Sequence, residues 1–325
     1  MAHAFCVQAL RHTVLTDYDF RESPLSQNIP YAYERWLFHH ATHLQLQASS
    51  GWHSFYAVHN AHHAIDAHLH VHIDGTQALA PYRAPFGSYQ FRSGMPPVAL
   101  YEFIAFTLSR LREKGVTEFV VKNPPLAYQH GAIDMLTTFQ INLGFEVVQA
   151  EAGSVLDPSR EFRAGLDAWE LRKLRQAEKA GLSFAVLDMT ELESVYTFIL
   201  ACRTERGYTL SMDWETLRKT VMAFPDRFIL FAAKHQEIVA AAAIAYNAGN
   251  GILVNFHSAH PRDYDHLSPV VLLLEGMMQY AREKGYRMLD LGTSALDGKP
   301  NFGLLNFKMR TGASVTSKLT LVRRW

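Results

Sequence analysis

The sequence lacks the features of membrane, disulfide-rich and disordered proteins. No apolar run approaches the ~20 residues that a membrane-spanning helix needs. Only two cysteines occur, Cys6 and Cys202, without metal or redox spacing, so we expect reduced thiols. The N-terminus has no basic-then-apolar signal pattern, and we therefore expect a cytoplasmic protein. Apolar residues make up 48% and charged residues 19% of the 325 positions, which excludes a disordered chain.

The chain also has no net charge, because 31 Lys and Arg balance 31 Asp and Glu. Bulk charge therefore gives no indication of nucleic-acid binding. The two halves differ, however: residues 1–159 hold 9 basic and 13 acidic side chains, whereas residues 160–325 hold 22 and 18. Of the 17 histidines, 13 lie in the first half. This difference predicts two domains with different surface chemistry.

An internal repeat supports two related domains. Arg112-Glu-Lys-Gly115 recurs as Arg282-Glu-Lys-Gly285, and each copy ends an amphipathic helix that follows a proline. A short apolar strand, a helix and a last strand follow each copy, and hairpin-like strands precede it. The repeated order favours a duplication, although two α/β domains can also look alike because all such domains do.

A basic helix is predicted between the halves, over residues 160–180, ending at Gly181. Its charged residues can form a solvated helix face or a phosphate-binding patch. They are Arg160, Arg163, Arg172, Lys173, Arg175 and Lys179.

The element order resembles the GNAT (Gcn5-related N-acyltransferase) fold, and the tandem arrangement resembles the FemAB-type branch. The most specific motif is Asp290-Leu-Gly-Thr-Ser294 followed by Pro300-Asn-Phe-Gly-Leu-Leu-Asn-Phe-Lys308 and Gly312. The resemblance implies an α/β fold of two GNAT-like domains in tandem, with mixed central sheets flanked by helices. We expect an N-terminal domain over residues 1–158 and a C-terminal domain over residues 159–325 that opens with the basic helix.

The resemblance implies an N-acyltransferase or aminoacyltransferase that moves an acyl group from a thioester or ester to an amine by direct attack. Acyl-CoA is the expected donor, but GNAT enzymes hold its pyrophosphate with a glycine-containing loop. Here that loop is Pro261–Pro269, which contains Arg262 and no glycine. Two alternatives remain: a catalytically degenerate binding protein, or a FemAB-like peptidoglycan aminoacyltransferase that uses aminoacyl-tRNA, for which bulk charge gives no support. The acceptor would be a small-molecule or peptide amine.

Candidate site residues follow from the same resemblance and lie in the second domain. Asp290 is a candidate base or amine-binding carboxylate, or else an acceptor within the following turn. Tyr264 is a candidate proton donor to the leaving group, or else a packing residue. The candidate donor-binding residues are Arg262, Ser268, Asn301 and Lys308. The candidate acceptor-binding residues are Glu205, Arg206 and Tyr208.

Histidines of the first half have metal-ligand spacing. His68, His70 and His72 alternate on a predicted strand and so share one face, while His39 and His43 stand one helical turn apart. They indicate either a zinc or nickel site or no site. The aligned second-half strand carries alanines, and no acidic or cysteine ligand completes a pattern, so we predict no required metal.

Overall fold

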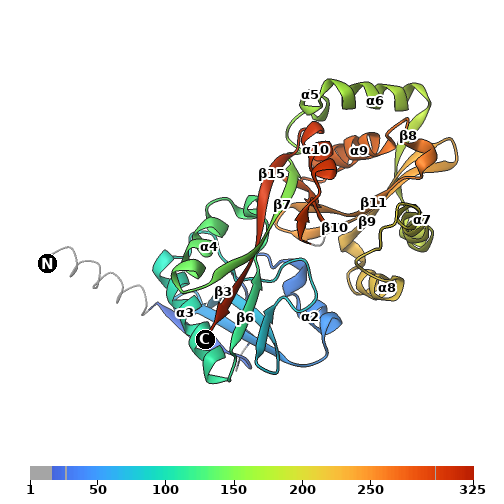
Figure 1. The fold of residues 1–325 in the computed structure, drawn as a ribbon. Coiled ribbons are helices and arrows are strands. Elements are labelled where there is room, and N and C mark those ends of the chain that lie inside the picture. The colour runs from blue at the N-terminus through green and yellow to red at the C-terminus, as the bar shows by residue number, and fades with distance from the viewer. Residues whose placement is uncertain (1–16, 26–27, 297) are drawn as a thin grey trace. The chain divides into compact units, whose positions relative to one another are not determined.

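The computed structural model describes residues 17–25, 28–296 and 298–325, which form two compact units (Figure 1). The first unit holds the described residues up to Ala150 together with Ser317–Trp325, and the second holds Glu151–Thr316. This division differs from the expected boundary between residues 158 and 159. No helix in the described part of the chain is long and apolar enough to cross a membrane.

The first unit is built on a mixed sheet whose strands run in the order β1-β2-β3-β4-β6-β15. The pairs from β1 to β4 are antiparallel, β4 and β6 are parallel, and the end of β15 lies antiparallel to β6. The short strand β5 (Gln90–Phe91) adds to β3. The bounds are β1 Tyr18–Glu22, β2 Trp52–His59, β3 Ala64–Asp74, β4 Gln77–Ala80, β6 Glu118–Lys122 and β15 Ser314–Arg324.

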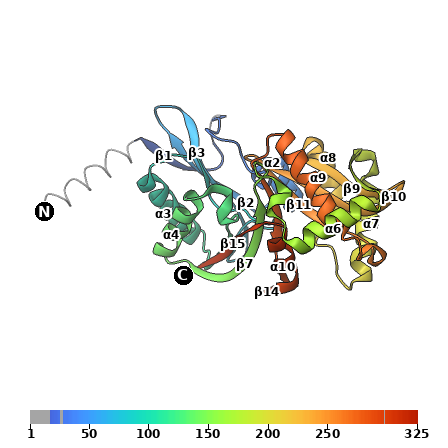
Figure 2. The same cartoon turned by 90° about the horizontal axis from the view of Figure 1, so that it is seen from above.

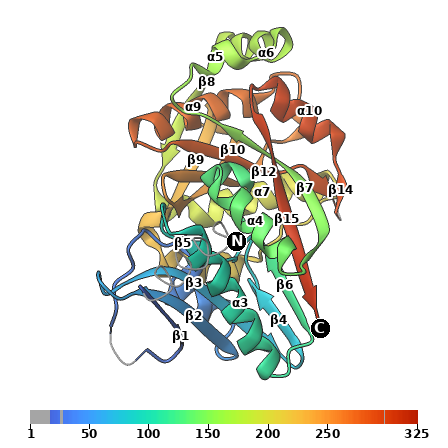
Figure 3. The same ribbon diagram turned by 90° about the vertical axis from the view of Figure 1, so that its left-hand side faces the viewer.

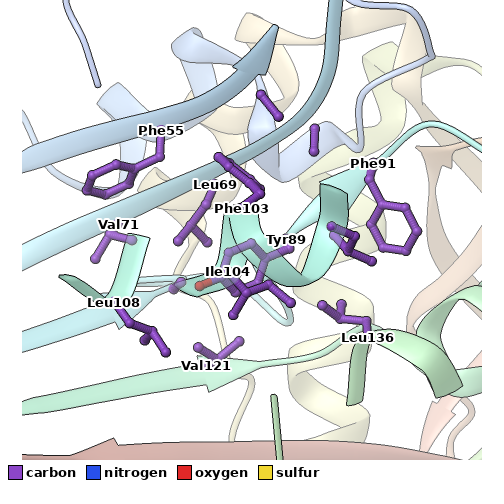
Figure 4. Close-up of a cluster of buried hydrophobic side chains, with 14 of the residues drawn as sticks. Phe55, Leu69, Val71, Tyr89, Phe91, Phe103, Ile104, Leu108, Val121 and Leu136 are labelled. Carbon is purple, nitrogen blue, oxygen red and sulfur yellow. The ribbon is translucent and has the colours of Figure 1, made fainter. Parts of the chain in front are cut away.

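Helices α3 (Pro97–Glu113) and α4 (Ala132–Asn142) lie on one side of these strands (Figure 3). The predicted apolar stripe of α3 is buried, because Leu100, Ile104, Leu108 and Leu111 recur every three or four residues and face the sheet. Phe55, Leu69 and Val71 pack against this stripe from the strands (Figure 4). The segments η1 (Leu37–His39) and α2 (Ala41–Gln47) precede β3 in the sequence, and His39 of η1 contacts His68 on the opposite face of β3.

The second unit repeats this plan, with strands in the order β7-β12-β11-β10-β9-β8. Helices α6 and α9 lie on one side of the strands and α7 on the other (Figure 1), and seen from above α6 and α9 lie in front of the strands (Figure 2). Ala241, Ala243 and Ala245 of β10 are fully buried, and their small side chains let α9 approach through Leu273 and Met277.

The strand bounds are β7 Glu146–Leu156, β8 Leu182–Leu187, β9 Phe228–His235, β10 Ile238–Gly249, β11 Ile252–Ala259 and β12 Met288–Thr293. The helix bounds are α5 Phe162–Gly165, α6 Ala168–Lys179, α7 Leu192–Glu205, α8 Trp214–Ala223, α9 Pro269–Glu283 and α10 Phe302–Arg310.

The expected basic helix over residues 160–180 is two helices, α5 and α6. Asp167 separates them because its carboxylate accepts a hydrogen bond of 2.8 Å from the Glu170 amide and so caps the start of α6. Arg163 of α5 pairs with Glu275 and Glu178 instead of facing solvent alone. Arg160 precedes α5 and pairs with Asp157, so the other predicted cations, Arg172, Lys173, Arg175 and Lys179, belong to α6.

The last strand of each repeat pairs in the sheet of the other unit. Gly153–Leu156 of β7 lie antiparallel to β12 in the second unit. Thr320–Arg324 of β15 lie antiparallel to β6 in the first. The repeated order of elements is as predicted, and this exchange explains why the compact units do not coincide with the halves of the sequence.

Candidate functional site

The two central parallel strands of the second unit separate partway along their length. Strands β11 and β12 pair at Ile252–Met288, Leu253–Leu289 and Val254–Asp290, where their pairing ends. Strand β11 then bulges, since Ala245 of β10 is opposite Asn255 and the next partner, Ile244, is opposite His257. Beyond these points the peptide groups of the two strands no longer bond to each other, and they are available to line a site.

A cavity of about 600 Å³ opens at this separation, and every residue that lines it belongs to the second unit. Strand β11 and its following residue supply one wall and strand β12 another, with α7, α9 and α10 completing it. The polar and charged lining residues are Cys202, Arg203, Arg206, Tyr208, Asn255, Ser258, His260, Ser268, Thr293 and Lys308.

Lys308 places a desolvated ammonium group on the cavity wall. Helix α10 begins at Phe302, where Asn301 caps the helix by accepting a hydrogen bond of 3.0 Å from the Leu304 amide. Two turns on, Lys308 is 5% exposed, and its Nζ donates to the carbonyls of Gly292 and Thr293 at 2.9 and 3.0 Å. Burial lowers the pKa of Lys308 to about 8, although the nearby Asp290 carboxylate opposes that shift.

Asp290 itself lies behind the cavity lining. Its Oδ1 accepts a hydrogen bond of 2.7 Å from the Gly292 amide, which is the turn-acceptor alternative for this carboxylate. Gly292 has a φ of +72°, so the turn that Asp290 stabilises favours glycine at that position. Asp290 therefore acts on the site through the end of β12 and through the charge of Lys308.

A second polar cluster lies at the end of β11. Arg206 Nη2 donates to Asp265 Oδ1 at 2.6 Å, and His260 Nε2 lies 2.8 Å from the same oxygen. Burial lowers the pKa of His260, while its hydrogen bond to Asp265 raises it less strongly. His260 is therefore neutral at neutral pH, and the tautomer that donates Nε2–H to Asp265 leaves Nδ1 with its lone pair.

The predicted residues fall into two sets. Those that line the cavity are Ser268, Lys308, Arg206 and Tyr208. Those outside the lining are Asp290, Tyr264, Arg262, Asn301 and Glu205. Arg262 and Glu205 interact with each other: Arg262 Nη2 donates to the Glu205 carbonyl at 3.1 Å, and the two side chains form an ion pair. Tyr264 packs against the apolar core of the second unit, which is its packing alternative.

Most backbone amides of the loop before α9 donate hydrogen bonds to carbonyls of the same loop. Ser268, with a φ of +49°, and Leu267 both donate to the Tyr264 carbonyl, at 3.1 and 3.0 Å. The amides of residues 264 and 265 bond to the carbonyls of residues 261 and 262. Pro269, the first residue of α9, has no N–H. The amides that would hold a pyrophosphate at this helix start are thus largely occupied, so the loop does not fit that group of coenzyme A.

Several lining residues carry no recognisable sequence signal. Arg203 of α7 stands one turn before Arg206, the C-cap of that helix, and this spacing is the one signal that could have indicated it. Asn255 and His260 face the cavity because β11 bulges and leaves β12, which depends on tertiary structure and not on local sequence.

The histidine face of the first unit is buried and hydrogen-bonded. His68 Nε2 lies 2.8 Å from His39 Nδ1, its Nδ1 lies 2.6 Å from the Tyr33 hydroxyl, and His70 Nδ1 lies 2.7 Å from Ser54 Oγ. In the part of the chain that the structure describes, no group of three or more His, Cys, Asp or Glu is suited to hold a metal ion.

Comparisons with known proteins identify the fold. Residues 169–308 match the Acetyltransferase (GNAT) domain family. FemX is similar over 94% of this chain and 97% of its own, with a TM-score of 0.67 and 12% identity. A conserved protein of unknown function from Bacteroides thetaiotaomicron covers 97% of both chains with a TM-score of 0.57 and 9% identity. L-PGS from Bacillus licheniformis covers 80% and 81%, with a TM-score of 0.53 and 15% identity. Among curated proteins no sequence matches.

Proposed function

We propose that this chain, which has the tandem GNAT fold of FemAB-like proteins, is an N-acyltransferase or aminoacyltransferase. It moves an acyl group from a thioester or ester donor to an amine within the cavity of the second unit. The observation that carries the proposal is this cavity at the separation of β11 from β12, with the Lys308 ammonium on its wall.

Lys308 is suited to stabilise the charge that develops on the donor carbonyl. Attack by an amine turns that carbonyl oxygen into an oxyanion, and a fixed cation in a desolvated site stabilises it strongly. An ammonium group has three N–H donors, and the carbonyls of Gly292 and Thr293 accept two of them. The third is available to the oxyanion, assisted by amides of the separated strands.

His260 is suited to take the proton from the attacking amine. Its Nδ1 keeps a lone pair in the tautomer that Asp265 selects, and its lowered pKa keeps the ring neutral. The carboxylate of Asp265 then stabilises the imidazolium as it forms, and Arg206 fixes that carboxylate. The amine nitrogen bonds to the acyl carbon and gives the tetrahedral oxyanion. Its collapse breaks the bond to the donor sulfur or oxygen, and the leaving group takes the proton that His260 accepted, so no covalent enzyme intermediate is needed.

The proposed function has forms that differ in the donor: a thioester such as acyl-CoA, an ester such as aminoacyl-tRNA, or no donor in a degenerate binding protein. The amides of the loop before α9 are largely occupied, so they are not suited to bind the pyrophosphate of coenzyme A. This favours an ester donor such as aminoacyl-tRNA, or else a degenerate binding protein. An exposed aromatic and cationic surface supports the tRNA donor: Arg172 lies 4.2 Å from the ring centre of Trp169, with Lys173 beside it.

Donor binding tests these forms directly. Calorimetry with coenzyme A and acetyl-coenzyme A tests the thioester donor, and filter binding of charged tRNA tests the ester donor. Association with tRNA should weaken with salt and after charge reversal at Arg172 and Lys173. Failure of both donors at millimolar coenzyme A and micromolar tRNA would remove the transferase and leave the degenerate binding protein.

A further inference from the structure

Arg203 is a partly buried cation on the cavity wall, and it has no carboxylate partner among the described residues. Its Nη2 donates to the Ser258 carbonyl at 3.0 Å, and its Nε is buried without a hydrogen-bond partner. No ion pair joins it to a described Asp or Glu. Burial accordingly lowers the pKa of Arg203, and no neighbouring carboxylate counters that effect.

The neighbouring arginines are neutralised in a way that Arg203 is not. Arg206 pairs with Asp265 at 2.6 Å, and Arg262 lies beside Glu205. Lys308, on the facing wall, adds a second desolvated cation, whose pKa is lowered by burial and further by the charge of Arg203. Because withdrawing a charge from water without a partner is costly, a cavity with this arrangement is suited to a ligand that brings negative charge.

The geometry of the guanidinium narrows the kind of negative group. The Nε–H and an Nη–H form a parallel pair of donors that matches two oxygens of a carboxylate or a phosphate. At Arg203 the Nε–H of this pair is free, while Nη2 already has a carbonyl partner that holds the plane of the group. Asn255 Oδ1, also buried and without a partner on the same cavity, can accept an N–H from the ligand.

We propose that Arg203 binds an anionic group, carboxylate or phosphate, of the amine acceptor, and that Asn255 receives one of its N–H donors. The acceptor is then a zwitterionic molecule whose amine and anionic group lie within one cavity. The assignment to the acceptor rests on the proposed function, in which Lys308 serves the donor carbonyl. Binding of the anion itself does not depend on transfer.

The test compares three small amines: ethanolamine, which has no anionic group, glycylglycine, which has a carboxylate, and phosphoethanolamine, which has a phosphate. The Nε–H resonance of Arg203, identified by its loss in Arg203→Lys, is followed during titration of the full chain with each. We expect glycylglycine or phosphoethanolamine to shift it, and ethanolamine to leave it unchanged. Response to glycylglycine alone assigns a carboxylate, and response to phosphoethanolamine alone assigns a phosphate.

Variants keep the inference falsifiable. Arg203→Gln should weaken binding of the responding amine by about tenfold or more, as expected for a lost charged hydrogen-bond pair. Arg218→Gln, on the exposed face of α8, is the matched control and should bind normally. Affinity is read from the backbone amide of Ala259, and circular dichroism verifies that each variant is folded. The inference is overturned if all three amines bind equally well, or if Arg203→Gln binds the responding amine as tightly as the unmodified protein does. It is also overturned if no amine shifts the resonance at millimolar concentration. Failure of the donor-binding experiments would refute the proposed transfer reaction and leave this result on anion binding unaffected.

Discussion

Mildly acidic pH should destabilise the first unit, because several of its histidines are buried. Burial lowers the pKa of His70 to about 3, with a smaller contribution from the Arg35 charge, and lowers that of His43 to about 4. Burial also lowers the pKa of His39 and His68, which lie in the same hydrogen-bonded cluster. These rings are neutral in the fold and take up protons readily once exposed. The free energy of unfolding of the first unit is therefore highest above about pH 6.5, and it decreases as the pH falls below that value.

The magnitude follows from the proton that only the unfolded chain binds. At pH 5 an exposed histidine with its ordinary pKa of 6.5 is protonated, whereas His70 is still neutral. The difference of about 1.5 pH units costs about 2 kcal/mol of stability. His43, treated in the same way, adds about 2 kcal/mol, and the other two rings act in the same direction. A total of about 4 kcal/mol or more is a large part of the stability of a typical domain.

Hydrogen-exchange mass spectrometry on peptides from β3 measures the effect. The opening free energy of β3, corrected for intrinsic exchange at each pH, should fall by several kcal/mol between pH 7.5 and pH 5. His70→Gln should remove about 2 kcal/mol of that pH dependence, because glutamine does not titrate. His62→Gln, at an exposed position, should leave it unchanged. Equal protection of β3 at both pH values, or the same pH dependence in His70→Gln, would refute the reasoning.

Three further outcomes are expected. Lys308→Met should lower kcat/KM for transfer by about 10²-fold while the fold is retained, since it removes a cation that acts on the oxyanion; unchanged steady-state kinetics would contradict this role. The pH–rate profile should rise through the lowered pKa of His260 and fall above about 8 as Lys308 loses its proton, and in His260→Gln the rising limb should be absent. Gly276→Ala should destabilise the second unit by about 1–3 kcal/mol, because a Cβ there would lie 2.1 Å from the Phe184 ring; a melting temperature equal to that of the unmodified protein would count against it.

The order of elements could be predicted from sequence because it depends on local periodicity. The stripe of Leu100, Ile104, Leu108 and Leu111 is buried as its spacing predicts, and the motif ending at Lys308 places that lysine on the inner face of α10. The break at Asp167 was missed because a single N-cap residue divides an otherwise continuous helical pattern.

The remaining features depend on partners that are distant in sequence. Nothing in residues 252–259 shows that β11 leaves β12 after Val254, so Asn255 and His260 could not be recognised as cavity residues. Arg206 has a carboxylate partner and Arg203 has none among the described residues, and that difference exists only once Asp265 is brought to the end of α7. The predicted tyrosine, Tyr264, lies outside the cavity lining and packs against the core instead.

The exchange of the last strands makes the order of biosynthesis matter. The strand that completes the sheet of the first unit, Thr320–Arg324, leaves the ribosome more than 190 residues after β6, its partner. During synthesis the edge of β6 is therefore open, while the second unit can complete its own sheet with β7 as soon as β12 emerges. A gene cut between the two halves of the sequence would give two polypeptides that each lack a strand, and they should become stable only when expressed together.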